Sequence, residues 1–364
     1  MSTGFKYTFP AIKGLQAKRE YYVAMCPLKL VPKLFQHLEE ELPPEYRAQR
    51  IINKSRIPEI TKYIVDNPQD YVFSSLTASV DGEMEFIPYS DGNLGELSIP
   101  MEAKFLINDG QHRRTAIEEA LRINTNLQDE TISIVFFADK GLKRSQQMFA
   151  DLNKHAVNTT KSIGILYDNR DQLSQLSKRI IDKIPLLKGY TDKEVDNLSK
   201  YSPKIFTLTN LHSSICCTLG KKKGEISESE EKFISDYWKT ICSIIIEWKE
   251  VQSKSLSAYE LRKNYIHAHG VVIVAFGYLG NYFLTNNIKN YSSILKNLNS
   301  IDWKRSNLKD WNGRTISNGK INKNTAAIKL TCNKIKDLLG ISLTKEELEL
   351  EKNFIDNGGE NLNG

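Results

Sequence analysis

Alternating apolar and polar positions in the first 160 residues predict a sheet with helices. Segments rich in Tyr, Phe, Val and Ile predict strands at 7–12, 20–25, 71–80, 84–89, 104–108 and 131–138. Apolar residues three and four apart predict helices at 27–38, 57–65, 111–122 and 144–153. Asp81-Gly82, between two of these strands, is a hairpin signal. Because hairpins precede strand–helix pairs, we expect an α+β fold with a mixed sheet partly covered by helices.

Beyond residue 160 the strand pattern stops and helical spacing takes over. The expected helices lie at 163–167, 173–184, 230–248, 261–283, 293–298 and 326–339. The most apolar stretch, 270–284, is too short to span a membrane, which takes about 20 residues, and Gly277, Gly280 and Asn281 interrupt it. We therefore expect a buried helix there, in a second region that is mainly α-helical.

The length of 364 residues suggests about two domains. We predict an N-terminal domain at 1–160, a helical domain at 161–345 and an acidic, frayed tail at 346–364. No apolar stretch of signal-peptide length opens the chain. The five cysteines form no Cys-x-x-Cys pair, which favours reduced thiols. We therefore expect a cytoplasmic protein that does not enter a membrane.

Charge is distributed unevenly along the chain. The total is 50 Lys and Arg against 44 Asp and Glu, a net of +6. Residues 1–200 are neutral, with 27 of each sign, whereas 201–336 carry 21 basic and 10 acidic side chains and 337–364 carry 2 and 7. The basic region favours a polyanion such as nucleic acid as partner. The alternative is that its lysines form only the solvated faces of ordinary helices.

One turn has the composition of a phosphate site. The predicted strand 104–108 leads into Asp109-Gly110 and then a helix that opens with His112, Arg113 and Arg114. The free N–H groups of a helix start, its dipole and guanidinium groups all favour a phosphate, and Gly110 lets the backbone approach it closely. The alternative is a surface helix capped by Asp109, with the arginines in ordinary salt bridges.

Two sets of residues resemble known families. The run Asp109-Gly110-Gln111-His112-Arg113-Arg114-x-Ala116 is similar to the signature of the DGQHR-domain family. Further stretches resemble the DndB family of DNA sulfur modification: FPAIKG at 9–14, REYYVAMCP at 19–27, ELPPEYRAQR at 41–50, IPEITKYIVDNP at 57–68 and RSQQMFADLNKH at 144–155. The resemblance is dense over residues 5–170 and weaker beyond.

The resemblance carries expectations about fold and function. It implies a fold akin to the ParB and sulfiredoxin superfamily, in which a turn at a helix start holds nucleotide phosphates. It also implies an accessory, regulatory role in DNA phosphorothioation, with double-stranded DNA and other phosphorothioation proteins as partners. Related DGQHR proteins are linked to nucleotide hydrolysis, so we expect binding and hydrolysis of ATP or another NTP. Two alternatives stay open: a DNA-binding repressor of the modification genes without enzymatic activity, and an assembly scaffold.

For the enzyme, the resemblance suggests roles for particular residues. Asp109 and His112 would be catalytic, and Asp109 and Asp151 would hold Mg²⁺ in a weak Mg-dependent ATPase. The expected phosphate-binding residues are Gly110, Gln111, Arg113, Arg114, Asn153 and Arg50. The alternative for Asp151 and Asn153 is an exposed helix end.

For DNA, the candidate surface lies around two tryptophans, Trp303 and Trp311. Its basic residues are Lys304, Arg305, Lys309 and Arg314, continued by Lys320, Lys323 and Lys329. These side chains can neutralise phosphates. The tryptophans either stack on bases or anchor the loop in the core. The oligomeric state is left open, a homo-oligomer included.

Other residues that can bind metals or react have simpler interpretations. His267 and His269 are two apart, so they do not share a helix face as a zinc pair four apart would, and structural roles are expected. Cys26 would be a reactive thiol only if a nearby cation lowered its pKa.

Overall fold

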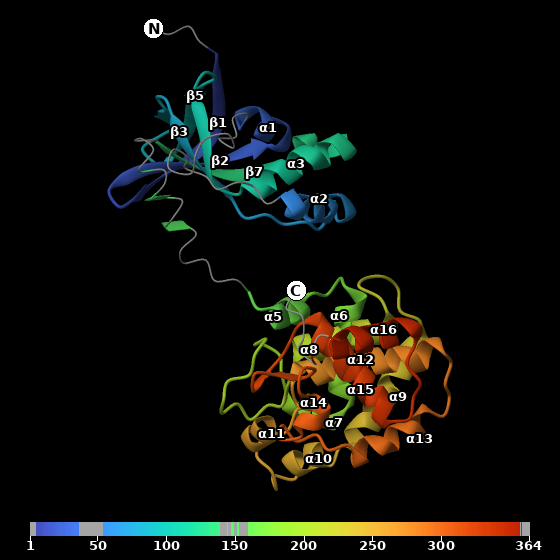
Figure 1. The fold of residues 1–364 in the computed structure, drawn as a ribbon. Coiled ribbons are helices and arrows are strands. Elements are labelled where there is room, and N and C mark those ends of the chain that lie inside the picture. The colour runs from blue at the N-terminus through green and yellow to red at the C-terminus, as the bar shows by residue number, and fades with distance from the viewer. Residues whose placement is uncertain are drawn as a thin grey trace. The chain divides into compact units, whose positions relative to one another are not determined.

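The chain folds into two compact units, each with its own hydrophobic core. The computed structural model describes residues 5–35, 54–138, 144, 147–148, 151–152, 159–356 and 358 (Figure 1). The units are Met1–Val157 and Asn158–Gly364. The first contains a sheet and helices, and the second is largely helical, which confirms the predicted α+β class.

A seven-stranded mixed sheet organises the first unit, in the order β4-β5-β1-β2-β7-β3-β6. Its strands are β1 Lys6–Gln16, β2 Arg19–Pro27, β3 Leu76–Asp81, β4 Glu85–Pro88, β5 Leu94–Pro100, β6 Lys104–Asp109 and β7 Thr131–Ala138. The pair β3 and β7 is parallel, whereas the other neighbouring strands are antiparallel. In β7, Ile132, Ile134 and Phe136 are buried and alternate with more exposed residues, as the period of a strand requires.

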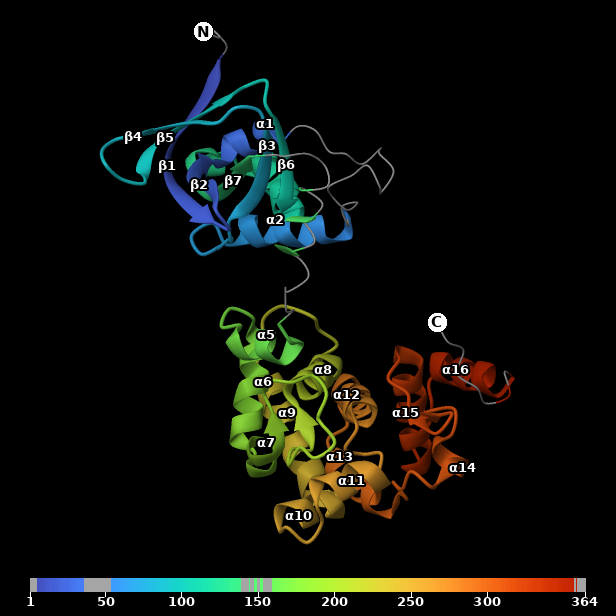
Figure 2. The same cartoon turned by 90° about the vertical axis from the view of Figure 1, so that its left-hand side faces the viewer.

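Helices α1 (Val31–Leu34), α2 (Ile57–Asp66) and α3 (Gln111–Ile123) accompany this sheet (Figure 2). Helix α3 buries Ala116, Ile117 and Ala120, which follow helical spacing, and it packs against both α1 and α2. The helix predicted at 27–38 is shorter: a 3-10 turn over Leu28–Leu30 leads into α1. The helix predicted at 144–153 lies mainly outside the described residues.

The hairpin predicted at Asp81-Gly82 is wrong. Strand β3 pairs with β6 and β7, whereas β4 pairs with β5, a strand that the sequence pattern did not indicate. All residues of β3 except Asp81 are buried. A strand buried on both faces belongs inside a sheet between two partners; for β3 these are β7 and β6, while β4 lies at the opposite edge of the sheet.

The second unit is built mainly from helices, as predicted. They are α5 Lys161–Tyr167, α6 Gln172–Lys183, α7 Pro185–Tyr190, α8 Leu208–Leu219, α9 Glu228–Ile244, α10 Ile246–Gln252, α11 Ala258–Asn264, α12 Gly270–Thr285, α13 Tyr291–Leu295, α14 Leu308–Trp311, α15 Thr325–Leu338 and α16 Lys345–Asp356. Two short strand pairs join loops: β8 Thr191–Asp192 with β9 Phe206–Thr207, and β10 Ile316–Ser317 with β11 Lys320–Ile321.

Helix α12 lies in the core of this unit and is buried along most of its length, as expected for 270–284. It packs tightly on α8: a Cβ at Gly277 would overlap the Ser214 carbonyl oxygen. Within the described residues, no helix combines the length and apolar character that crossing a bilayer demands. The single helix predicted at 261–283 is interrupted, because α11 ends at Asn264 and α12 begins at Gly270.

The acidic segment at the C-terminus is not frayed over its first part. Residues 345–356 form α16. Its Glu347 Oε1 lies 2.5 Å from Lys336 Nζ, and its Glu351 Oε2 lies 2.6 Å from Arg314 Nη2. The acidic charge therefore neutralises cations of the same unit and fixes the helix against α15.

Candidate functional site

The turn at residues 109–114 has the strand–glycine–helix geometry that its sequence indicates. Asp109 ends β6, and Gly110 has a left-handed backbone with φ +102° where α3 begins. A Cβ at this position would collide with Leu76 Cδ2, so the turn requires glycine. The first N–H groups of α3 therefore face a closely packed turn.

Arg113 is used to hold this turn in place. Its Nη2 donates to Asp109 Oδ2 at 2.5 Å, and its Nη1 donates to the carbonyl oxygens of Ser74 at 2.6 Å and Ser75 at 3.1 Å. The side chain is 16% exposed. Arg113 thus connects the start of α3 to the segment before β3, and Asp109 is its ion-pair partner.

Arg114 is buried and joins α3 to α1. Its Nη1 donates to Glu118 Oε2 at 2.5 Å, and its Nη2 donates to the Pro32 carbonyl at 3.3 Å. Glu118 also accepts from the exposed Arg122 at 2.9 Å. The guanidinium charge of Arg114 is therefore balanced inside the unit.

Three buried donors at this turn have no hydrogen-bond partner within the described residues. They are Asn108 Nδ2, Gln111 Nε2 and Arg114 Nε. Asn108 is 0% exposed and Gln111 is 5% exposed, while Asn108 Oδ1 accepts from Ser79 Oγ at 2.9 Å. An unpaired buried donor costs about 1–3 kcal/mol, so an acceptor arriving here would be bound favourably. Sequence reasoning missed Asn108, because it lies inside a strand that reads as apolar.

The other predicted enzyme residues are not brought into one cluster by the described structure. His112 is half-buried on the first turn of α3. Asp151 is exposed, and its Oδ1 accepts from Gln147 Nε2 at 2.7 Å. Arg50 and Asn153 lie outside the described residues.

A magnesium site does not follow from the part of the chain that the structure describes. No group of three His, Cys, Asp or Glu side chains gathers there. One oxygen of Asp109 is held by Arg113, and Mg²⁺ prefers several oxygen ligands in octahedral geometry.

The two tryptophans of the candidate DNA surface anchor their loop in the core. Trp303 is 3% exposed and Trp311 is 0% exposed, and their rings stack with centroids 5.4 Å apart. Their indole N–H groups donate to the carbonyls of Leu298 at 3.0 Å and Asp302 at 2.8 Å. Neither ring is therefore available for stacking on a base.

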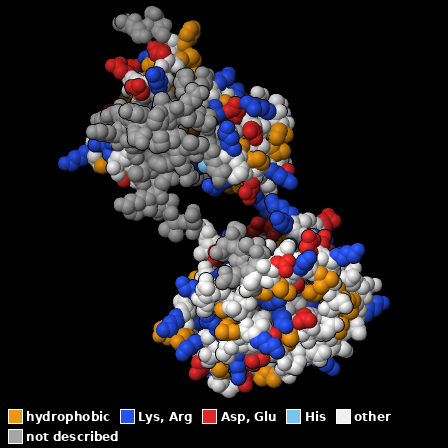
Figure 3. Space-filling view, viewed as in Figure 1, with side chains coloured by type: hydrophobic (Ala, Val, Ile, Leu, Met, Phe, Trp, Pro, Cys, Tyr) orange, Lys and Arg blue, Asp and Glu red, His pale blue; other side chains and the backbone are white. Residues whose placement is uncertain are grey.

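The basic residues of this surface differ in how their charges are used. Arg314 pairs with Glu351 and lies 4.5 Å from the centroid of the Phe354 ring, so it supports the fold. Lys304 and Lys309 are exposed, and Arg305 donates to the Gly319 carbonyl at 3.1 Å. Figure 3 shows Lys and Arg side chains on the visible face of the second unit, mixed with acidic and apolar ones.

His267, His269 and Cys26 take structural positions. His267 is fully buried, and its Nδ1 accepts from Trp248 Nε1 at 3.0 Å. His269 Nε2 donates to the Arg262 carbonyl at 2.9 Å, and burial lowers the pKa of His269 to about 4. Burial raises the pKa of Cys26 to about 12, so this thiol is not activated.

Comparison with known proteins identifies the family. The chain matches the family model described as "DndB: DNA-sulfur modification-associated" over residues 9–342. This range includes the turn at 109–114 and the candidate DNA surface around Trp303 and Trp311. Searches of curated proteins and of solved structures found no match. The match covers nearly the whole chain and agrees with the resemblance carried by residues 109–116. The chain therefore belongs to the DndB family, which is associated with DNA sulfur modification.

Proposed function

We propose that this chain is a DNA-binding accessory protein of DNA sulfur modification and regulates the modification genes by binding double-stranded DNA. The observation that carries the proposal is a set of exposed cations in the second unit. Among the described residues, no carboxylate lies within ion-pair distance of Lys304, Lys309, Lys320 or Lys329. Such charges are free to displace counterions from a phosphate backbone.

Other lysines of the same unit are neutralised by the fold. Lys336 pairs with Glu347, Lys334 pairs with Asp310 and Asp337, and Lys221 pairs with Glu230. Exposed lysines elsewhere in the unit, such as Lys232, Lys239 and Lys289, also lack an ion pair, so what sets this surface apart is that its lysines lie close together around one loop and hairpin. None of them forms an ion pair within the described residues, although Lys304 and Lys309 interact electrostatically with Glu247 and Asp310.

The Arg305 side chain joins the loop at 304–305 to the tip of the β10–β11 hairpin, and its backbone N–H joins the loop to the end of α11. Arg305 N donates to the Asn264 carbonyl at 2.8 Å, while its Nη2 reaches Gly319 O, next to Lys320. Lys304 forms an antiparallel bridge with Tyr265. The buried tryptophans below fix this loop, so its lysines are presented on a rigid base, which lowers the entropic cost of binding.

The test is the affinity for promoter DNA of the modification genes after replacing Lys304, Lys309 and Lys320 together by glutamine. We expect at least a tenfold loss. The matched control replaces three exposed lysines elsewhere in the unit, Lys232→Gln, Lys239→Gln and Lys289→Gln. If the control variant loses as much DNA affinity, the effect comes from net charge alone. If neither variant loses DNA affinity, the proposed surface is contradicted.

A second candidate function is nucleotide binding at the turn. The three unpaired donors of Asn108, Gln111 and Arg114 support it, because phosphate oxygens are the acceptors that a helix start attracts. Arg113 and Arg114 would then act mainly by positioning the turn, since their guanidinium groups are already paired. His112, on the same first turn, would contact the phosphate chain.

Gln111→Met tests this second function without dismantling the turn. It removes an unpaired donor and keeps the side-chain length, so the fold should persist while ATP affinity, measured by calorimetry, falls at least fivefold. Arg122→Ala, at the other end of α3, is the control and should bind like the wild type. Equal ATP affinity in Gln111→Met would remove the turn from any nucleotide site.

Hydrolysis needs its own measurement. If the turn also hydrolyses the nucleotide, Asp109→Asn should abolish phosphate release while circular dichroism shows an intact fold. A chain that releases no phosphate, but binds promoter DNA, is the repressor without enzymatic activity. A chain that binds neither DNA nor nucleotide, but retains other phosphorothioation proteins, is the scaffold.

A further inference from the structure

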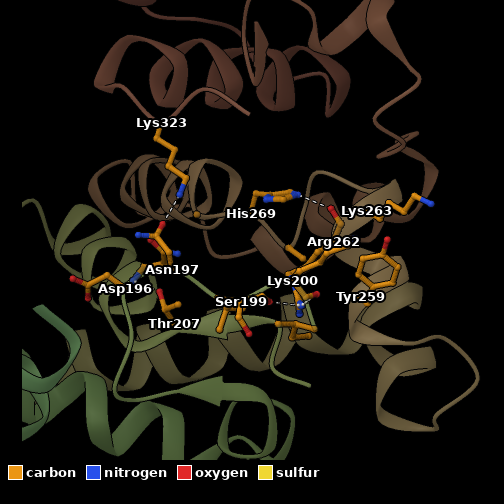
Figure 4. A pocket seen from close by; sticks show the side chains of 15 residues that line it. Asp196, Asn197, Ser199, Lys200, Thr207, Tyr259, Arg262, Lys263, His269 and Lys323 are labelled. Atoms are coloured by element: carbon orange, nitrogen blue, oxygen red, sulfur yellow. Dashed lines mark hydrogen bonds between the residues drawn. The ribbon is translucent and has the colours of Figure 1, made fainter. Parts of the chain in front are cut away.

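The second unit contains a cavity of about 360 Å³ that the sequence pattern did not indicate. We call it the basic pocket, and the lining residues that matter are Asp196, Lys200, Tyr259, Arg262, Lys263 and Lys323. It lies between the segment 196–200, the start of α8, helix α11 and the start of α12 (Figure 4). All of its residues belong to the second unit, and its volume is that of small-molecule sites.

The one carboxylate that lines the pocket is held by neutral hydrogen-bond donors. Asp196 Oδ1 accepts from Ser162 N at 2.9 Å and Thr209 Oγ1 at 2.7 Å, and its Oδ2 accepts from Lys161 N at 3.0 Å. Burial alone would raise the pKa of Asp196, but these hydrogen bonds outweigh it and lower the pKa. Asp196 thus stays ionised, its oxygens are committed to the start of α5 and to Thr209, and it forms no ion pair with the described cations that line the pocket.

Arg262 holds the wall of the pocket with its charge unbalanced. Its Nη2 donates to the carbonyl oxygens of Ser199 at 3.2 Å, Lys200 at 3.0 Å and Ser202 at 2.9 Å, and its Nη1 donates to that of Lys204. Carbonyl dipoles orient a guanidinium but do not cancel its charge. Burial lowers the pKa of Arg262, and no carboxylate among the described residues forms an ion pair with it.

Two lysines are positioned by tyrosine rings. Lys200 Nζ lies 5.1 Å from the ring centroid of Tyr201 and 5.6 Å from that of Tyr259. Lys263 Nζ lies 5.9 Å from the ring centroid of Tyr259. Cation–π contacts hold an ammonium group without neutralising it. The ring of Tyr259 is thus engaged with lysines and not available to stack on a base.

Lys323 completes the cationic lining from the opposite side. Its Nζ donates to Asn197 Oδ1 at 2.6 Å, which is a neutral acceptor (Figure 4). The described residues offer no ion-pair partner to Lys200, Lys263 or Lys323. All three are exposed, so a ligand can reach them from solvent.

The start of α12 adds to the positive potential. His269 precedes this helix and its side chain caps none of the first N–H groups. Asn210 Oδ1 lies only 2.6 Å from where a Cβ of Gly270 would be, so Asn210 lines the first turn of α12. The positive end of a 16-residue helix therefore faces a pocket lined by four cations, of which Lys263 also interacts electrostatically with Glu260.

We infer that the basic pocket binds a small anion that carries several phosphates, such as the phosphate chain of a free nucleotide. Four cations that form no ion pair among the described residues match a multiply charged ligand better than a single phosphate. A duplex presents its phosphates on a convex surface, which a cavity of about 360 Å³ does not accommodate. This site is independent of the proposed DNA surface, because it uses none of Lys304, Lys309 and Lys320.

The test is calorimetry of the full chain with three probes: inorganic tripolyphosphate, ATP and adenosine. We expect tripolyphosphate and ATP to bind with similar affinity and adenosine not to bind. Replacing Lys200, Lys263 and Lys323 by glutamine should weaken tripolyphosphate binding at least tenfold. Because these side chains are exposed, the triple variant should fold. If it does not fold, Lys200→Gln alone should still weaken tripolyphosphate binding threefold.

Two controls separate this pocket from the other proposals. Gln111→Met, at the turn of the first unit, should leave the tripolyphosphate and ATP binding of the basic pocket unchanged, and so should the variant that lacks Lys304, Lys309 and Lys320. Binding that is lost in Gln111→Met but kept in the variant of Lys200, Lys263 and Lys323 belongs to the turn. Unchanged tripolyphosphate affinity after the loss of Lys200, Lys263 and Lys323 would overturn the inference. Binding of adenosine equal to that of ATP would overturn it as well, because recognition would then depend on the nucleoside.

Discussion

The turn at residues 109–114 and the basic surface of the second unit use their cations in opposite ways. At the turn, Arg113 and Arg114 are paired with Asp109 and Glu118, and the groups left unpaired are neutral amide donors. In the second unit, Lys304, Lys309, Lys320 and Lys329 form no ion pair among the described residues, while Trp303 and Trp311 beside them are buried. The comparison shows that an arginine in a motif can be committed to the fold, which makes uncompensated charges and donors the better candidates for binding groups.

The largest expected effect tests whether Arg114 is structural. Arg114→Ala would leave Glu118 and the Pro32 carbonyl without their buried donor, so we expect the free energy of unfolding to fall by about 3–4 kcal/mol. Urea denaturation measures the change, and Arg122→Ala, which is 71% exposed, should cost less than about 0.5 kcal/mol. Comparable small losses in both variants would mean that Arg114 is not needed for packing and is free for a ligand.

The second effect is acid sensitivity of the second unit. Burial, together with the charges of Arg305 and Lys323, lowers the pKa of His269 to about 4, against about 6.5 in an unfolded chain. The neutral imidazole therefore contributes stability that is complete above pH 6.5 and lost as the pH falls toward 4. The loss amounts to about 3 kcal/mol.

Comparing His269→Gln with the wild type isolates this contribution. Glutamine can still donate to the Arg262 carbonyl but does not titrate. Between pH 7 and pH 4, the free energy of unfolding of the variant should therefore fall by about 3 kcal/mol less than that of the wild type. His212 and His267, whose pKa values burial also lowers, act in both proteins and cancel. Parallel pH profiles for the two proteins would show that His269 charges without penalty.

The third prediction compares two basic residues of the candidate DNA surface, Arg314 and Lys304. Arg314→Ala breaks a largely buried ion pair with Glu351, so we expect a loss of about 2 kcal/mol in stability. Lys304→Ala should change stability by less than about 0.5 kcal/mol, yet weaken DNA binding. Thermal unfolding and DNA titration of both variants give the answer. The reverse pattern, with Arg314 affecting only DNA binding, would undo the distinction between paired and unpaired cations.

The smallest expected effect concerns the unpaired donors of the turn. Gln111→Met replaces a buried donor that has no partner among the described residues by an apolar group of similar length. We expect stability to change by less than about 0.5 kcal/mol, or to rise by up to about 1 kcal/mol. Chemical denaturation without nucleotide provides the measurement, and a loss above about 2 kcal/mol would show that the Gln111 amide is bonded in the folded chain.

The fold class followed from the sequence because periodicity is a local property. Strands β1, β2, β6 and β7 were predicted by apolar alternation, and α6 and α15 by helical spacing. Strand β5 was missed because Gly95 and Glu96 weaken its pattern, and pairing with both β1 and β4 defines it. Helix α8 is rich in Ser, Thr and Cys, which are weak helix formers. Its cap at Thr207 and its packing on α12 stabilise it instead.

For the turn at residues 109–114, the sequence predicted the backbone elements but not the side-chain contacts. The sequence indicates strand, glycine and helix at residues 104–123, and the structure has them. The partners of Arg113 at Ser74 and Ser75 lie 39 and 38 residues away in the chain, and such long-range contacts leave no periodic signal. The basic pocket was not predicted from the sequence for the same reason, because Lys200, Arg262 and Lys323 come together only through folding.

The salt dependence of promoter DNA affinity tests most directly whether uncompensated lysines contact the phosphate backbone. Affinity is measured between 50 and 300 mM salt for the wild type and for the chain with Lys304, Lys309 and Lys320 replaced by glutamine. Each lost phosphate contact lowers the slope of log K against log salt by about 0.9, so we predict a slope shallower by about 2.7. An identical slope in both proteins would place the DNA contacts elsewhere and contradict the account.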